Sequence, residues 1–314
     1  MTKIDLPFDL DSIPGRTRRW VKGGMKRTDR WVQGLGGRVG PLIPNTLATG
    51  GVGDWTPQGL GHDPETNLLA QSYYSHDNGS ALVLVDLKSG RSAAEVLLVG
   101  YRGKAGPGHA GGVAIDGDDV WVSKGAAGAG RLYRYSLSAI GESTKGAEVE
   151  PVEAPTKVAA GSYCRIRGDR LYVGGFAKQT LYAYARAEDG EWDFSEPVLS
   201  TTTPPQVQGV VVRGAEYVFS SSFGRHRPST IFICERKPDG GVGAVRRQYK
   251  FPNMAEAIVE VSGELITTYE SGASPYSRPA AYGFGILIGR MWASTHMTCT
   301  PIASLGLAPD PGAG

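Results

Sequence analysis

The sequence predicts an all-β fold, a five-bladed β-propeller with about 50 residues per blade and a basic N-terminal arm. Three observations predict it. A strand–turn–strand hairpin recurs five times along the chain, and a third strand follows each hairpin at a regular spacing. The composition, with 45 glycine and 14 tyrosine residues, suits many short strands joined by tight turns. Units of this kind stack around an axis because each alone would expose two apolar faces.

Each hairpin begins with an equivalent residue at the start of its first strand. These five starters are Gln58, Gly111, Ser162, Gln208 and Glu256. A turn glycine follows six or seven residues later in four copies, at Gly117, Gly168, Gly214 and Gly263. The first copy has "DPET" in that place, which is itself a turn signal.

The third strand recurs more regularly than the hairpin. It reads "ALVLVDL" from Ala81, "RLYRYSL" from Arg131, "TLYAYAR" from Thr180 and "TIFICER" from Thr230. A weaker, more polar fourth strand such as "SAAEVLLVG" or "EPVLSTT" follows it. In the fifth unit an insertion, "SGASPYSRPAAYG", precedes the third strand, which we expect near "GILIGRMWAS".

These patterns divide the chain into three parts. Residues 1–56 lack the hairpin pattern and form the N-terminal basic arm and linker, so they supply no sixth blade. Residues 57–303 form the five-bladed propeller, and residues 304–314 form a flexible C-terminal tail.

The arm carries a basic, aromatic segment. Residues 15–38 contain eight Arg and Lys residues against one acid, Asp29, with Trp20 and Trp31 among them. Three uses remain open: packing on the side of the propeller, peripheral contact with an anionic membrane, or contact with a partner protein or nucleic acid. The formal net charge is only +2, so we expect no sequence-specific binding of nucleic acid.

Two further features concern compartment and thiol chemistry. The N-terminus lacks the apolar run of a signal peptide, and the longest apolar runs, such as "ALVLV", are too short to span a bilayer, so the chain as given is expected to be cytoplasmic.

Cys164, Cys234 and Cys299 form no CxxC-type pair. They are expected to be buried structural thiols rather than metal ligands.

Several motifs carry a resemblance. The Gln-Gly starter, "GGVAIDGDDVWVS", "FSSSFGR" and "MAEAI…TYESGA" resemble a group of actinobacterial propeller proteins without assigned activity, many of them secreted. The organisation is more distantly similar to the senescence-marker-protein, gluconolactonase and strictosidine-synthase propellers, which have six blades. The resemblance covers about residues 55–300 and implies the fold but almost no function.

Blade topology brings polar residues together. In a propeller the innermost strand of each blade starts at one rim of the central channel, and the second strand returns to that rim. The starters and the second-strand ends therefore converge on one face, the default arrangement of a ligand site. Besides the starters, the expected ligand-binding residues are Tyr74, Lys124, Tyr163, Ser221, Arg225 and Tyr269.

Three residues are candidates for acid/base chemistry. Glu256 begins an inner strand, where a carboxyl group would be partly desolvated. Glu270 follows an apolar strand in "TYESGAS", and His109 lies between glycines in "GPGHAGG". For each residue a structural role is the alternative: the two glutamines can link neighbouring blades, the serines can cap strand ends, and Arg225 can lie in a solvated basic loop.

The resemblance also raises the question of metal. Gluconolactonase-type propellers hold a divalent cation with several carboxylate and amide oxygens, whereas the starters here offer one carboxylate. We therefore expect no metal and no cofactor, although His109, Glu256 and Glu270 could supply three ligands.

The sequence thus favours an enzyme of hydrolase, isomerase, lyase or cyclase type. It would act by metal-independent acid/base chemistry on a small molecule or peptide at the top of the channel. The alternative is a non-catalytic ligand-binding or scaffold propeller that docks a partner or membrane through its basic arm. Blade-to-blade hydrogen bonds that occupy the whole ring would favour the alternative. A desolvated Glu256 near Glu270 or His109 would favour chemistry.

Overall fold

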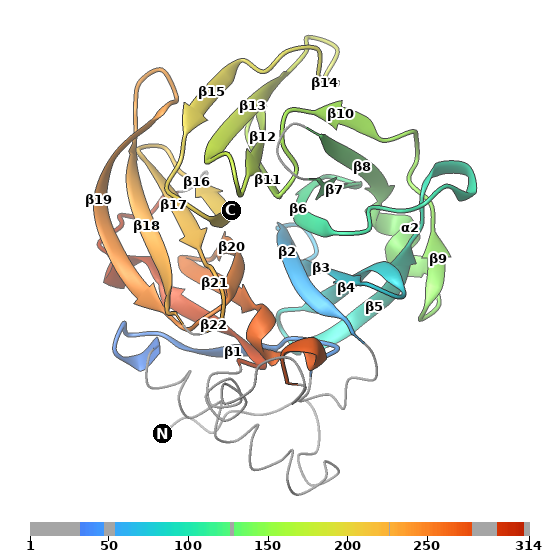
Figure 1. The fold of residues 1–314 in the computed structure, drawn as a ribbon, viewed down its shortest axis with the longest axis horizontal. Coiled ribbons are helices and arrows are strands. Elements are labelled where there is room, and N and C mark those ends of the chain that lie inside the picture. The colour runs from blue at the N-terminus through green and yellow to red at the C-terminus, as the bar shows by residue number, and fades with distance from the viewer. Residues whose placement is uncertain (1–31, 47–53, 126–128, 226, 278–293, 311–314) are drawn as a thin grey trace, which may run out of the picture.

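The computed structural model describes residues 32–46, 54–125, 129–225, 227–277 and 294–310. Within these ranges the strands form five sheets, antiparallel except for one added strand in the first, and the sheets are arranged in a ring, as Figure 1 shows. The prediction of a five-bladed β-propeller is therefore confirmed. The part of the chain that the structure describes contains no helix long and apolar enough to cross a membrane.

The first two blades follow the predicted hairpin and third-strand pattern. The strands of the first blade are β2 (Thr56–Asp63), β3 (Leu68–Ser75), β4 (Gly79–Asp86), β5 (Arg91–Leu98) and the added parallel strand β9 (Ala147–Val149). The strands of the second blade are β6 (Ala110–Asp116), β7 (Asp119–Lys124), β8 (Gly130–Ser136) and β10 (Thr156–Val158). Between β8 and β9 lies the short helix α2 (Leu137–Glu142), whose N-cap hydroxyl, from Ser136, accepts a hydrogen bond from the backbone N–H of Ala139.

The third and fourth blades repeat the arrangement. The strands of the third blade are β11 (Tyr163–Arg167), β12 (Arg170–Gly175), β13 (Thr180–Arg186), β14 (Trp192–Asp193) and β15 (Leu199–Thr202). The strands of the fourth blade are β16 (Val207–Val212), β17 (Glu216–Ser221), β18 (Ser229–Arg236) and β19 (Val242–Phe251).

The fifth blade joins the two ends of the chain and differs from the prediction. It contains β20 (Ala255–Val261), β21 (Glu264–Tyr269), β22 (His296–Pro301) and, as its outer strand, β1 (Arg38–Leu42). The third strand is thus His296–Pro301 rather than a strand near "GILIGRMWAS", most of which lies outside the described residues. Arg38–Leu42, which the sequence placed in the arm and linker, pairs antiparallel with β22 and closes the ring. The remaining basic residues of segment 15–38 lie outside the described residues.

The hydrophobic core lies between blades rather than within them. Among the described residues it forms five buried clusters, each shared by two neighbouring blades. The cluster that contains Leu69 and Val83 of the first blade also contains Val259 and Ile266 of the fifth, so the last interface of the ring is as apolar as the others. The three cysteines are buried and unpaired, as predicted.

Glycines allow the inner strands to approach one another closely. A Cβ atom added to Gly59 would lie 2.6 Å from the carbonyl carbon of Gly112, and one added to Gly209 would lie 2.9 Å from the Cα of Ala257. A Cβ on Gly112 would overlap the backbone nitrogen of Cys164 in the next blade. These positions must be glycine because the backbones of adjacent inner strands are in contact there.

This contact predicts a large effect of one methyl group. Replacing Gly112 by Ala should lower the free energy of unfolding by about 3 kcal/mol, because the inner strands of the second and third blades must separate. Gly141→Ala is the matched control, since its Cβ meets nothing within 4 Å. That variant should be as stable as the wild type or gain up to about 1 kcal/mol from helix propensity. Urea denaturation measures both, and equal stability of the two variants would contradict the role given to the close contact.

Paired charges occupy the end of the channel opposite the starters. The Arg213 guanidinium is 1% exposed and donates to the carboxylate of Glu260 over 2.5 Å and to the carbonyl of Ala308. Arg167 donates to both carboxylate oxygens of Asp310 over 2.8 and 3.1 Å. The residues from Ile302 to Asp310 therefore pack across this end. The tail expected to be flexible is held in place as far as Asp310.

The Asp310 contact should contribute measurably to stability. Asp310→Asn removes the charge that faces the partly buried Arg167, and charged hydrogen bonds of this kind contribute about 1.5–3 kcal/mol. Glu235→Gln is the control, because its ion pair with Arg246 is largely exposed and should contribute less than about 1 kcal/mol. A similar loss in both variants, measured by thermal or urea denaturation, would show that Asp310 does not hold the tail.

Candidate functional site

The starters lie at irregularities of the inner strands. The pairing register shifts between Pro57 and Leu60 in β2, between Ala110 and Gly112 in β6, between Val207 and Gly209 in β16 and between Ala255 and Ile258 in β20. Each irregular segment contains the starter of its blade. Irregularities of this kind change the direction of a side chain, and they are common beside active sites. Four of the predicted starter positions are therefore local distortions at one rim of the channel.

Two carboxyl groups meet at this rim. Glu256, in β20, is 3% exposed, and Glu270, the first residue of the 3₁₀ helix η4 (Glu270–Gly272), is 9% exposed. The two side chains are hydrogen-bonded to each other. Such a bond requires a proton, because two carboxylates cannot donate to one another. The structure thus brings together two of the three residues predicted for acid/base chemistry.

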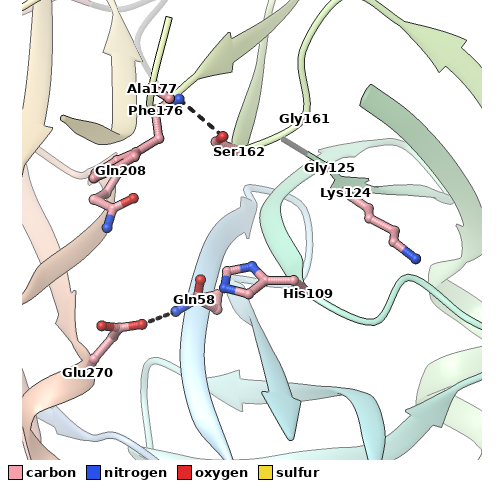
Figure 2. A pocket seen from close by; sticks show the side chains of 10 residues that line it. All are labelled: Gln58, His109, Lys124, Gly125, Gly161, Ser162, Phe176, Ala177, Gln208 and Glu270. Atoms are coloured by element: carbon pink, nitrogen blue, oxygen red, sulfur yellow. Dashed lines mark hydrogen bonds between the residues drawn. The ribbon is translucent and has the colours of Figure 1, made fainter. Parts of the chain in front are cut away.

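Two glutamine starters hold this carboxyl pair. Gln208 of the fourth blade donates to the Oε1 atom of Glu256 over 3.0 Å. Gln58 of the first blade donates to the Oε1 atom of Glu270, as Figure 2 shows. Both bonds cross a blade interface, so the glutamines link neighbouring blades and orient the acids at the same time.

Burial controls the protonation of the pair. Desolvation, together with the neighbouring Glu270, raises the pKa of Glu256 well above its ordinary value. Desolvation also raises the pKa of Glu270, to about 7, against the opposing effect of its hydrogen bonds from Gln58, Tyr276 and Glu256. At neutral pH Glu256 therefore carries a proton and Glu270 is poised between its two forms.

A tyrosine that the sequence analysis missed completes the surroundings of the pair. Tyr276, in the 3₁₀ helix η5 (Ser274–Ser277), donates to the Oε2 atom of Glu270 over 3.3 Å and is hydrogen-bonded to Tyr74. The Arg225 guanidinium lies over the ring of Tyr276, 5.7 Å from its centroid. No signal in the sequence separated Tyr276 from the other polar residues of its loop, because its position depends on the turn that follows β21.

His109 and Tyr74 form an aromatic pair on the other side of Gln58. Their rings stack with centroids 4.2 Å apart and an interplanar angle of 24°. Burial lowers the pKa of His109, so the imidazole is neutral at pH 7. A neutral imidazole can accept one hydrogen bond and donate another.

Gln58, His109 and Glu270 help to line a cavity of about 560 Å³, a size typical of small-molecule sites. Figure 2 shows its lining, which includes six predicted site residues: Gln58, His109, Lys124, Ser162, Gln208 and Glu270. Phe176, at the end of the second strand of the third blade, is a lining residue that was not predicted to bind a ligand. Glu256 lies behind this lining and reaches it through Gln208 and Glu270.

The structure places other predicted residues away from the lining. Tyr163 and Tyr269 are buried in the cores between blades, and the Tyr269 hydroxyl is 2.7 Å from that of Thr298. The Ser221 hydroxyl donates to the Pro205 carbonyl over 2.6 Å, which caps the strand end. Ser162, in contrast, does line the cavity, but its hydroxyl oxygen already accepts a hydrogen bond from the backbone N–H of Phe176 over 3.1 Å.

The described residues contain no cluster of three His, Cys, Asp or Glu side chains that could hold a metal ion. The starters of this rim instead include two amides and one carboxyl group that carries a proton.

The proteins to which this chain is similar are distant solved structures. No protein-family model matches the chain, and neither does any curated protein. Solved structures do match. Glutaminyl cyclase from Myxococcus xanthus is 13% identical, with 83% of this chain and 93% of that chain covered and a TM-score of 0.47. Regucalcin, a calcium-binding protein from Agrobacterium tumefaciens, is 11% identical, with coverage of 83% and 92% and a TM-score of 0.47.

A third match is the PQQ-bound aldose sugar dehydrogenase from Streptomyces coelicolor, 16% identical, with 74% of this chain and 76% of that chain covered and a TM-score of 0.41. Identities this low indicate a likeness of fold and assign no activity. The closer resemblance to an actinobacterial group has no support among these matches.

The shared proton predicts a pH dependence of stability. The pKa of Glu270 is about 7 in the folded protein and near 4.5 in the unfolded chain, so the folded state binds more protons between these values. The contribution of Glu270 is fully present below pH 4.5 and is lost as the pH rises through 7. Relative to Glu270→Gln, which does not titrate, the wild type should therefore lose stability between pH 5 and pH 8 in urea denaturation.

Tyr276→Phe provides a second measurement. The variant removes a hydrogen bond that lowers the pKa of Glu270, so the loss of stability should extend to higher pH. A stability difference between wild type and Glu270→Gln that stays constant from pH 5 to pH 8 would show that Glu270 titrates as an ordinary exposed carboxyl group.

Proposed function

We propose that the protein binds a small molecule or peptide in the cavity at the channel rim and transforms it by acid/base chemistry. The observation that carries this proposal is the buried pair of carboxyl groups, Glu256 and Glu270, beside the cavity, whose pKa values burial raises. Proton transfer is most efficient when the pKa of the catalytic group lies near the working pH. A pKa of about 7 gives Glu270 that property.

The arrangement assigns a role to each group. Glu270 lines the cavity and accepts a proton from the substrate, while Glu256 behind it keeps the second proton and stabilises the pair. The neutral His109 binds a polar atom of the substrate or exchanges a proton with it. Hydrolysis, isomerisation and cyclisation all need a proton moved between two atoms without a change of oxidation state, and the pair suits any of them.

The second candidate is a binding propeller without turnover. Gln58 and Gln208 each join two blades through the carboxyl pair, an arrangement that would also serve simply to close the ring. The pKa of about 7 for Glu270 beside the cavity favours chemistry over this alternative, because binding alone does not need a group that titrates near neutral pH. In the binding role, Glu270 would orient a ligand and the ligand would leave unchanged.

A turnover screen tests the proposal. Wild type, Glu270→Gln and the control Glu148→Gln, an exposed glutamate on β9, are incubated with lactones, aryl esters and short peptides, and products are followed by mass spectrometry. A substrate should be converted by wild type and control, with the rate falling about 10²–10⁴-fold in Glu270→Gln. Equal rates in all three proteins would remove Glu270 from the chemistry. Stabilisation by a probe that is never converted would instead support the binding propeller.

A further inference from the structure

Lys124 is a cation without a partner at the cavity. It ends β7 and is half-buried, and a Cβ atom built on Gly108 would lie 3.4 Å from its Nζ atom, so the side chain runs along the loop that carries His109. Among the described residues no carboxylate lies within ion-pair distance of its ammonium group. The arginines at the other end of the channel, Arg167 and Arg213, are in contrast paired with acids.

The lining separates this cation from the acids. In the view of Figure 2, Lys124 and Glu270 lie at opposite edges of the lining, with Gln58 and His109 between them. Because Glu256 is protonated and Glu270 shares its proton, the acidic edge carries at most one negative charge at neutral pH. An anionic group of a ligand is therefore attracted to the Lys124 edge, and a neutral polar group suits the Glu270 edge.

A third part of the site is apolar. Phe176 lines the cavity, and its ring lies 6.3 Å from that of Phe223, which comes from the fourth blade. Phe223 is 59% exposed, the largest exposed fraction among the large hydrophobic residues of the described chain. Phe176 in the lining and the exposed ring of Phe223 beside it thus form an apolar surface from two neighbouring blades, on which a flat or aliphatic ligand body can pack.

From these three parts we infer the class of ligand: a small carboxylic acid with an apolar or aromatic body. Its carboxylate binds the ammonium group of Lys124, its body packs on Phe176 and Phe223, and its reacting polar group faces Glu270. The inference rests on the proposed function for the reacting end of the ligand. The carboxylate end depends on Lys124 alone and is tested separately.

The test compares an acid with its neutral amide. N-benzoylglycine and N-benzoylglycinamide have the same aromatic body and differ in the charge of one end. Calorimetric titration of the wild type should show binding of the acid roughly tenfold tighter than the amide, since only the acid gives the ammonium group of Lys124 a charged hydrogen-bond partner. Lys124→Met should reduce the affinity for the acid to that for the amide, and Lys124→Arg should restore most of it.

Lys178→Met is the matched control, because Lys178 is an exposed lysine that follows the second strand of the third blade and does not line the cavity. It should bind the acid as the wild type does. Equal affinities for acid and amide, no binding of either, or an unchanged affinity in Lys124→Met would overturn the inference and show that Lys124 is a solvated lysine. The proposed function fails on a different result, unchanged turnover in Glu270→Gln, so the two failures can be told apart.

Discussion

The backbone contact between inner strands is the constraint on which the rest of the structure depends. Gly59 lies against Gly112, Gly112 against Cys164, and Gly209 against Ala257, so that neighbouring blades touch through main-chain atoms near the channel. A side chain at these positions would push the blades apart and widen the ring. The contact sets how closely the blades approach, and thereby allows a residue of the first blade and one of the fourth to reach the same pair of acids in the fifth.

The same contact explains the chemistry of the rim. The starters precede these glycines or lie beside them, in the irregular segments of the inner strands, and their side chains are held where the blades converge. Glu256 and Glu270 are buried there with amide and hydroxyl neighbours, and no described Lys, Arg or His side chain forms an ion pair with either of them. A carboxyl group in such surroundings retains its proton, since burial disfavours the charged form and no positive charge compensates. The close approach of the blades buries the two carboxyl groups, and this burial raises their pKa values.

Among the described residues, charged side chains form ion pairs at one end of the channel but not at the other. At one end Arg213 pairs with Glu260 and Arg167 pairs with Asp310, and the segment from Ile302 to Asp310 packs over them. These ion pairs hold the C-terminal segment on the propeller, and their charges are not available to a ligand. At the other end the acids are paired with each other, and Lys124 has no acid beside it in the described chain. The charged and titratable groups that are free to bind a ligand, Lys124 and Glu270, therefore lie at the rim that lines the cavity.

Local sequence was enough to determine the hairpins, the third strands of four blades and the convergence of the starters, because strand alternation and turn glycines act within a few residues. It placed Glu256, Glu270 and His109 at one rim. It did not reveal that Arg38–Leu42 completes the fifth blade, that His296–Pro301 is its third strand, or that Tyr276 reaches Glu270. Nor did it show that Tyr163 and Tyr269 belong to the core. The pairing of Arg38–Leu42 with β22 and the cores between blades join segments far apart in the chain, and the contact of Tyr276 depends on the turn after β21. Only the folded structure decides which of these side chains meet and which lose contact with water.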